Sequence, residues 1–123
     1  MNYVVTCLTY KRKDPKILTM LKSDPSLKIV FGVRREEYVS GFYSDWEKAD
    51  WCEQVRFALL DNIVDAGDTR QKILDWTHDK GYQYCVMLDD TAEALRDEQF
   101  PDAPPSVVIE NAINVIEQSE LKP

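Results

Sequence analysis

Two adjacent carboxylates follow a short apolar run, and their types and spacing suit them to hold a cation. The run Tyr84–Leu88 follows Gly81 and ends on Asp89 and Asp90. It is too short for a helix and is typical of a strand buried on both faces, in the middle of a parallel sheet. Neighbouring carboxylates repel each other unless a cation or a hydrogen-bond donor lies between them, and a divalent metal carrying a phosphorylated ligand would satisfy both. The alternative is that the two acids begin a loop in which Asp90 or Thr91 caps the next helix.

Three further polar groups follow predicted strands or open a predicted helix. They are Thr9 to Arg12 after the first strand, Arg34 to Glu36 after the second, and Gly67 to Arg70 at a helix start. Ligands of open α/β sheets bind beyond the carboxyl ends of the strands, and helix N-termini attract phosphate. Arg12 or Arg70 would offset the phosphate charge that a metal leaves uncompensated. We therefore expect these groups to converge on one edge of the sheet and to hold a metal–diphosphate with its nucleoside.

The elements that must position these side chains alternate along the chain. The apolar patterns predict strands over residues 2–9, 28–33, 55–60 and 84–88, helices from 14–15 to 22 and over 68–80, 92–98 and 106–119, and short helical turns with a loop over 34–50. The first helix is expected to start on Asp14 and Pro15, and the second on Asp68 and Thr69. Tyr38 to Trp51 holds aromatic residues that we expect to pack locally. This order predicts an α/β fold with a mostly parallel sheet of about four strands and helices on both faces.

Composition narrows the possible functions. The chain has 123 residues, which suits one domain, and a net charge of −7, which argues against sequence-independent binding to nucleic acid. Its three cysteines form no close-spaced pair, so they predict neither a disulfide framework nor a zinc site, and its one histidine makes a histidine-rich metal site improbable. No signal peptide or membrane-spanning run is recognisable, so we expect a cytoplasmic protein with no membrane partner.

The pattern resembles the nucleotide-sugar-binding half of a GT-A-type (Rossmann-like) glycosyltransferase. The resemblance rests on Val4–Thr9, on Gly67–Leu74 and on Tyr84–Asp90, whereas the dinucleotide and P-loop fingerprints are absent. It implies a metal-dependent transferase that binds a nucleotide-diphosphate sugar. The site residues that it implies are Asp89 and Asp90 for manganese or magnesium, Asp89 also for ribose, Arg70 for the nucleotide-sugar, Thr9, Tyr10 and Arg12 beside the nucleoside, and Glu36 for the base or ribose.

Within that family, the chain is similar to the small TET-associated phage glycosyltransferases that act with modified DNA bases. The acceptor is not readable from the sequence, and a modified nucleic-acid base is the candidate that this resemblance implies. Thr91 stands where the family motif has a third acid. The resemblance covers only about half of such an enzyme, so we expect residues 1–123 to be one nucleotide-sugar-binding domain and a fragment of a longer enzyme; a reduced nucleotide-binding domain is the other possibility. No catalytic residue is identified.

Two other functional classes remain open from the sequence. One is a non-catalytic α/β domain that binds a nucleotide or a partner protein, in which Asp89 and Asp90 only end a strand. The other is a phosphoacceptor (receiver-like) domain, which would want an acid pair after the first strand, where this chain has Thr9, Tyr10 and Lys11. If the chain is a fragment, an exposed sheet edge or the helix over 106–119 would favour self-association.

Overall fold

The computed structural model describes residues 2–118 and has an α/β fold built on a four-stranded, all-parallel sheet with the order β3-β2-β1-β4. The predicted fold class and parallel sheet are therefore confirmed. The elements are β1 (Tyr3–Leu8), α1 (Ile17–Ser23), β2 (Ile29–Arg34), α2 (Arg35–Val39), the 3-10 turns η1 (Ser44–Lys48) and η2 (Cys52–Gln54), β3 (Val55–Leu60), α3 (Ala66–Asp79), β4 (Tyr84–Asp89) and α4 (Pro105–Glu117).

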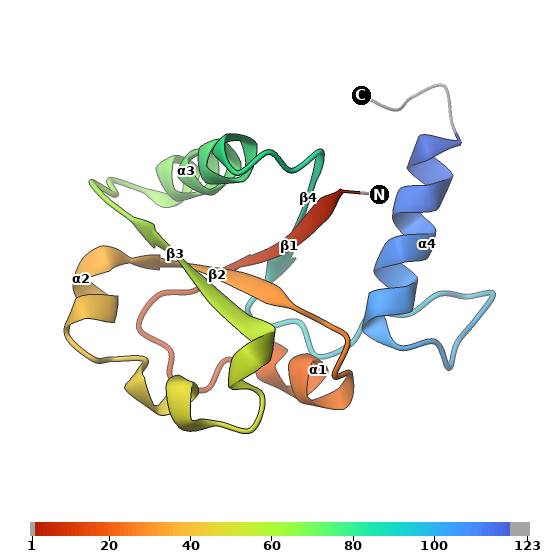
Figure 1. Cartoon of the computed structure of the whole chain (residues 1–123), viewed down its shortest axis with the longest axis horizontal. Helices are drawn as coiled ribbons and strands as arrows, with labels where there is room; N and C mark the ends of the chain where they lie inside the picture. The colour runs from red at the N-terminus through yellow and green to blue at the C-terminus, as the bar shows by residue number, and fades with distance from the viewer. Residues whose placement is uncertain (1, 119–123) are drawn as a thin grey trace.

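Alternation along the inner strands gives each face of the sheet its own helices. Val5 and Phe31 pack with buried residues of α1 and α4 in the larger core cluster. Val4 and Val30 belong to a smaller cluster on the other face, with Ile73 of α3. Figure 1 shows the same two layers, with α3 on one side of the sheet and α1 on the opposite side. Both faces are thus covered, as expected for strands joined by parallel crossovers.

The chain changes direction across the sheet between β1 and β4. From β1 it passes to β2 and then to β3, and α3 carries it back to β4 on the far side of β1. The strand order therefore reverses at the β1–β4 pair, which is aligned from Tyr3 opposite Tyr84 to Leu8 opposite Asp89. The crevice outside the carboxyl ends of two strands at such a reversal is where open α/β sheets bind ligands.

The position of β4 within the sheet corrects the sequence interpretation. Among the described residues β4 pairs only with β1, so it is an edge strand and the prediction of a central strand was wrong. Its apolar run has another cause, because Val86 and Leu88 pack against the larger core cluster and Cys85 against the smaller one. The strand therefore needs apolar side chains on both faces although one of its edges is free. Self-association through this edge or through α4 stays a prediction.

Helix boundaries also differ from expectation. The first helix begins at Ile17 and has no side-chain cap, so Asp14 does not start it. In α3 the cap is Asp65, whose carboxylate accepts a hydrogen bond from the Asp68 amide at 2.8 Å. Residues 92–98 are not helical. The final helix agrees closely with expectation, although its predicted last residue, Ser119, lies outside the described residues.

The aromatic residues of the β2–β3 connection form part of the core. Tyr43 and Trp46 are almost fully buried, and their rings pack edge-on at a centroid distance of 5.0 Å. Trp46 also packs edge-on against Phe31 of β2. Local packing, as expected from the sequence, therefore accounts for this cluster and fixes the irregular connection against the sheet.

Candidate functional site at the β1–β4 strand ends

A cleft of about 760 Å³ lies at the carboxyl ends of the strands. Residues that line it come from the segments that follow β1 and β4, from the end of β2 and from the start of α3. Its polar lining includes Thr9, Tyr10, Arg12, Arg34, Asp65, Thr69, Arg70, Asp89, Asp90 and Thr91. The structure thus brings together the predicted site residues after the first strand, at the helix start and in the acidic pair.

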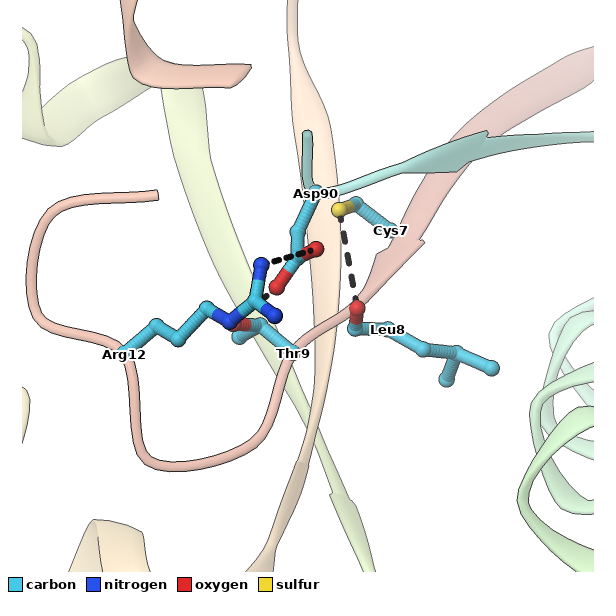
Figure 2. Close-up of polar contacts among 5 residues, drawn as sticks. All are labelled: Cys7, Leu8, Thr9, Arg12 and Asp90. Carbon is cyan, nitrogen blue, oxygen red and sulfur yellow. Dashed lines mark hydrogen bonds and ion pairs between the residues drawn. The ribbon is translucent and has the colours of Figure 1, made fainter. Parts of the chain in front are cut away.

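The turn after β1 binds the second of the two acids directly. Arg12 Nη1 donates to Asp90 Oδ1 at 3.0 Å, and Thr9 Oγ1 donates to Asp90 Oδ2 at 3.1 Å (Figure 2). The backbone carbonyl of Asp90 also accepts a hydrogen bond from the Ile17 amide at the start of α1. Both carboxylate oxygens of Asp90 are therefore engaged within the chain, and the residue joins the ends of β4, β1 and α1.

The first acid, Asp89, is in a different situation. Its side chain is exposed in the cleft, and among the described residues its carboxylate has no hydrogen-bond or ion-pair partner. No group of three His, Cys, Asp or Glu side chains that could hold a metal occurs in residues 2–118. A divalent cation here would thus have Asp89 as its readily available protein ligand and would take its other oxygens from a phosphorylated ligand and water, which is a common arrangement for Mg²⁺.

Three arginines also line the cleft. The Arg34 guanidinium lies over the Tyr10 ring, with the Cζ atom 4.1 Å from the ring centroid. Arg70 and Thr69 lie in the first turn and a half of α3, where backbone N–H groups give an anion favourable contacts. Arg12, Arg34 and Arg70 thus balance the formal charges of the three aspartates that line the same opening, although the net charge of the chain is −7.

Glu36 is the one predicted binding residue that does not line the cleft. It is exposed on α2, whereas its neighbour Glu37 is buried and accepts a hydrogen bond from the Lys11 amide. From the sequence, Arg34 was expected near the cleft as part of the Arg34 to Glu36 group but was not singled out as a binding residue, and Asp65 was not selected. Arg34 could have been chosen because it ends β2 on the same face as Val30, and Asp65 because it directly precedes the helix.

Cys7 lies near the acidic pair but does not line the cleft. Its side chain is buried, and Figure 2 shows its sulfur beside the Leu8 carbonyl oxygen, at 3.9 Å. Burial, reinforced by the negative charges of Asp90 and Asp89, raises the pKa of this thiol far above its usual value. The thiol therefore stays neutral and functions as a packing group.

No helix within residues 2–118 is long and apolar enough to cross a membrane. Comparisons with protein-family models, with curated proteins and with solved structures found no match to this chain.

Proposed function

We propose that the cleft binds a nucleotide-diphosphate sugar together with a divalent cation, and that the chain is the donor-binding domain of a glycosyltransferase with a truncated GT-A-type fold. The observation that carries the proposal is the convergence of three arginines with Asp89, whose carboxylate has no partner within residues 2–118, in one opening at the strand-order reversal. Arginines bind phosphate oxygens through charge-assisted hydrogen bonds. A diphosphate needs this kind of neutralisation, and the about 760 Å³ of the cleft lies within the range of small-molecule sites.

Each part of the cleft suits one part of such a ligand. The N-terminus of α3, with Arg70, faces the diphosphate, and the Tyr10–Arg34 pair offers a flat surface beside the base. Asp89 would hold manganese or magnesium, which would neutralise the charge that develops on the departing diphosphate during transfer. In that transfer the bond between the sugar carbon and the diphosphate oxygen breaks, and a bond to an acceptor oxygen or nitrogen forms. The acceptor group then loses its proton, and we assign no base to that step.

The contacts that Asp90 makes within the chain lead to a specific expectation of how ligand binding depends on the cation. Because its oxygens are bound by Arg12 and Thr9, the protein offers too few free ligands to hold a hard cation alone. Manganese without nucleotide is therefore expected to change the melting temperature little. Manganese with the nucleotide-sugar is expected to raise it, because the phosphates complete the coordination.

Thermal-shift titration with UDP-glucose and GDP-mannose, each with and without manganese, tests the proposal. Ligand at roughly 100 times its Kd stabilises the folded state by about 2.7 kcal/mol, which corresponds to a shift of several degrees. We expect Asp89→Asn to abolish the manganese-dependent part of the shift. Asp50→Asn, which changes an exposed acid far from the cleft lining, should leave it intact. No shift with any nucleotide-sugar, or an unchanged shift in Asp89→Asn, would contradict the proposal.

A second candidate is a non-catalytic α/β domain that binds a nucleotide or a partner protein. The engagement of Asp90 within the chain favours it, because that contact gives one of the two acids a structural reason to be present. The two candidates differ in turnover. Release of free sugar from UDP-glucose or GDP-mannose, lost in Asp89→Asn, supports the transferase; binding without any release or transfer supports the second candidate.

A further inference from the structure

The turn between β1 and α1 has a backbone conformation that must be stabilised by contacts from outside the turn. Lys11 has a φ of 53°, in the left-handed region that non-glycine residues rarely adopt. Thr9, Tyr10 and Arg12, on either side of it, all line the cleft. The position of these three side chains depends on the path of the turn, so whatever holds Lys11 also shapes the cleft.

Glu37 of α2 supplies that support from outside the cleft. Its Oε1 accepts a hydrogen bond from the Lys11 amide at 2.8 Å and another from the Tyr43 hydroxyl at 3.2 Å. Glu37 is only 7 % exposed and Tyr43 only 1 %, so both are fixed by packing. Hydrogen bonds to a buried carboxylate are stronger than those between neutral groups. The second oxygen, Oε2, has no partner among the described residues. Fold stability alone gives little reason to bury a half-satisfied charge here.

We infer that Glu37 is a positioning residue: it acts through the Lys11 backbone to hold Tyr10 and Arg12 at the cleft. Loss of its carboxylate frees the Lys11 amide and lets the turn leave the left-handed conformation. Arg12 then loses its fixed approach to Asp90, and the Tyr10–Arg34 pair comes apart. The consequence for ligand binding rests on the proposed function, whereas the effect on the turn does not.

Amide hydrogen exchange and the side-chain NMR signals of isotopically labelled protein test this inference without any ligand. In Glu37→Leu, which cannot accept a hydrogen bond, exchange of the Lys11 amide should speed up by about tenfold or more. The Arg12 guanidinium signal should move toward that of a free arginine. Glu37→Gln keeps one acceptor oxygen and a similar size, so it should show a smaller change and still allow the test if Glu37→Leu does not fold. The matched control is Glu36→Gln, an exposed neighbour on the same helix, which should change neither signal.

A second substitution in the Glu37→Leu variant distinguishes a positioning role of Glu37 from a general loss of stability. Glycine adopts a positive φ without strain, so Lys11→Gly added to Glu37→Leu should restore much of the Arg12 signal while leaving the melting temperature low. Affinity for UDP with manganese should fall about tenfold in Glu37→Leu and recover in the double variant. An unchanged Lys11 amide, an unchanged Arg12 signal or an unchanged UDP affinity in Glu37→Leu would each overturn the inference. If the wild-type protein binds no nucleotide, the proposed function fails, and the Lys11 and Arg12 signals still decide the role of Glu37.

Discussion

The two carboxylates at the carboxyl end of β4 differ in the hydrogen bonds and ion pairs that each already makes within the chain. Asp90 is bound by Arg12 and Thr9 and is mostly buried, with 15 % of its side chain exposed, whereas Asp89 has no hydrogen-bond or ion-pair partner in the described part of the chain. Adjacent residues of a strand point to opposite faces of the sheet. The side chains of the two acids at the end of β4 therefore have different surroundings. One acid therefore holds the architecture of the cleft, and the other is free to meet a ligand.

This difference predicts opposite behaviour of two conservative variants. Asp90→Asn removes the charge that Arg12 and Thr9 contact, so it should lower the free energy of unfolding by up to about 1 kcal/mol, a modest effect because Arg12 is half exposed. Asp89→Asn relieves repulsion between the acids and should leave stability unchanged or slightly higher. Urea denaturation of the two variants checks this. Equal losses of stability would show that Asp90 has no special structural role.

The sequence was a better guide to which residues lie near one another than to which atoms form contacts. The strand ends were recognisable from apolar runs that stop on polar residues, and this placed Thr9 and Asp89 at one edge; a predicted helix start added Arg70. The choice between Glu36 and Glu37 was not readable, because neighbouring helical residues point about 100° apart and the start of α2 fixes which of them faces the turn. The Arg12–Asp90 contact joins residues 78 positions apart, and it depends on β4 lying next to β1.

The start of α3 was also not readable from the sequence. Asp65 and Asp68 are both good cap residues, and each is followed by a plausible helix. The structure uses both: Asp65 accepts from the Asp68 amide, and Asp68 Oδ2 accepts from the Val64 amide at 3.1 Å. The helix therefore begins two residues before Asp68, where it was expected to start, and its cap Asp65 lines the cleft together with Thr69.

The cap makes a testable contribution to the stability of α3. Asp65→Ala leaves the Asp68 amide without its acceptor, so the free energy of unfolding should fall by about 1 kcal/mol. The control is Asp75→Ala, in the middle of the same helix, where the exposed carboxylate contacts only Gln71 among the described residues. There the higher helix propensity of alanine offsets the lost contact, so no loss of stability is expected. Chemical denaturation monitored by circular dichroism measures both. An equal effect of the two substitutions would mean that the first turn of α3 is not held by its cap.

Across the whole molecule, one buried acid ties the last helix to the rest of the fold. Asp24, after α1, is 5 % exposed; its carboxylate accepts from the Ser26 amide at 3.0 Å and from the Ser106 amide in the first turn of α4 at 2.9 Å. Gln54 Nε2 binds the carbonyls of Leu21, Asp24 and Leu27 around the same point. The docking of α4, which packs through Ile109 and Ile113, therefore depends on a polar junction as well as on the core.

The charge of Asp24 gives that junction a pH dependence. Burial alone would raise the pKa of Asp24, but hydrogen bonds from the Ser106 side chain and amide and from the Ser26 amide outweigh it and bring the pKa below the ordinary 3.8. A carboxyl whose pKa is lower in the folded state adds stability above its unfolded pKa, and this stability is lost as the pH falls through the folded pKa. We therefore expect the free energy of unfolding to decline below about pH 4, and the amides of α4 to lose protection first.

Asp24→Asn isolates this contribution. The variant keeps the size of the side chain but loses the charge, and its amide group cannot accept from both Ser26 and Ser106 as the carboxylate does. At neutral pH it should lower the free energy of unfolding by about 1 to 3 kcal/mol. Its difference from wild type should shrink as the pH falls, because wild-type Asp24 becomes neutral as well. Urea denaturation in steps from about pH 6 to about pH 3 measures the difference. A gap that stays constant over this range would show that the carboxylate charge does not hold α4, and that Ile109 and Ile113 dock the helix by packing alone.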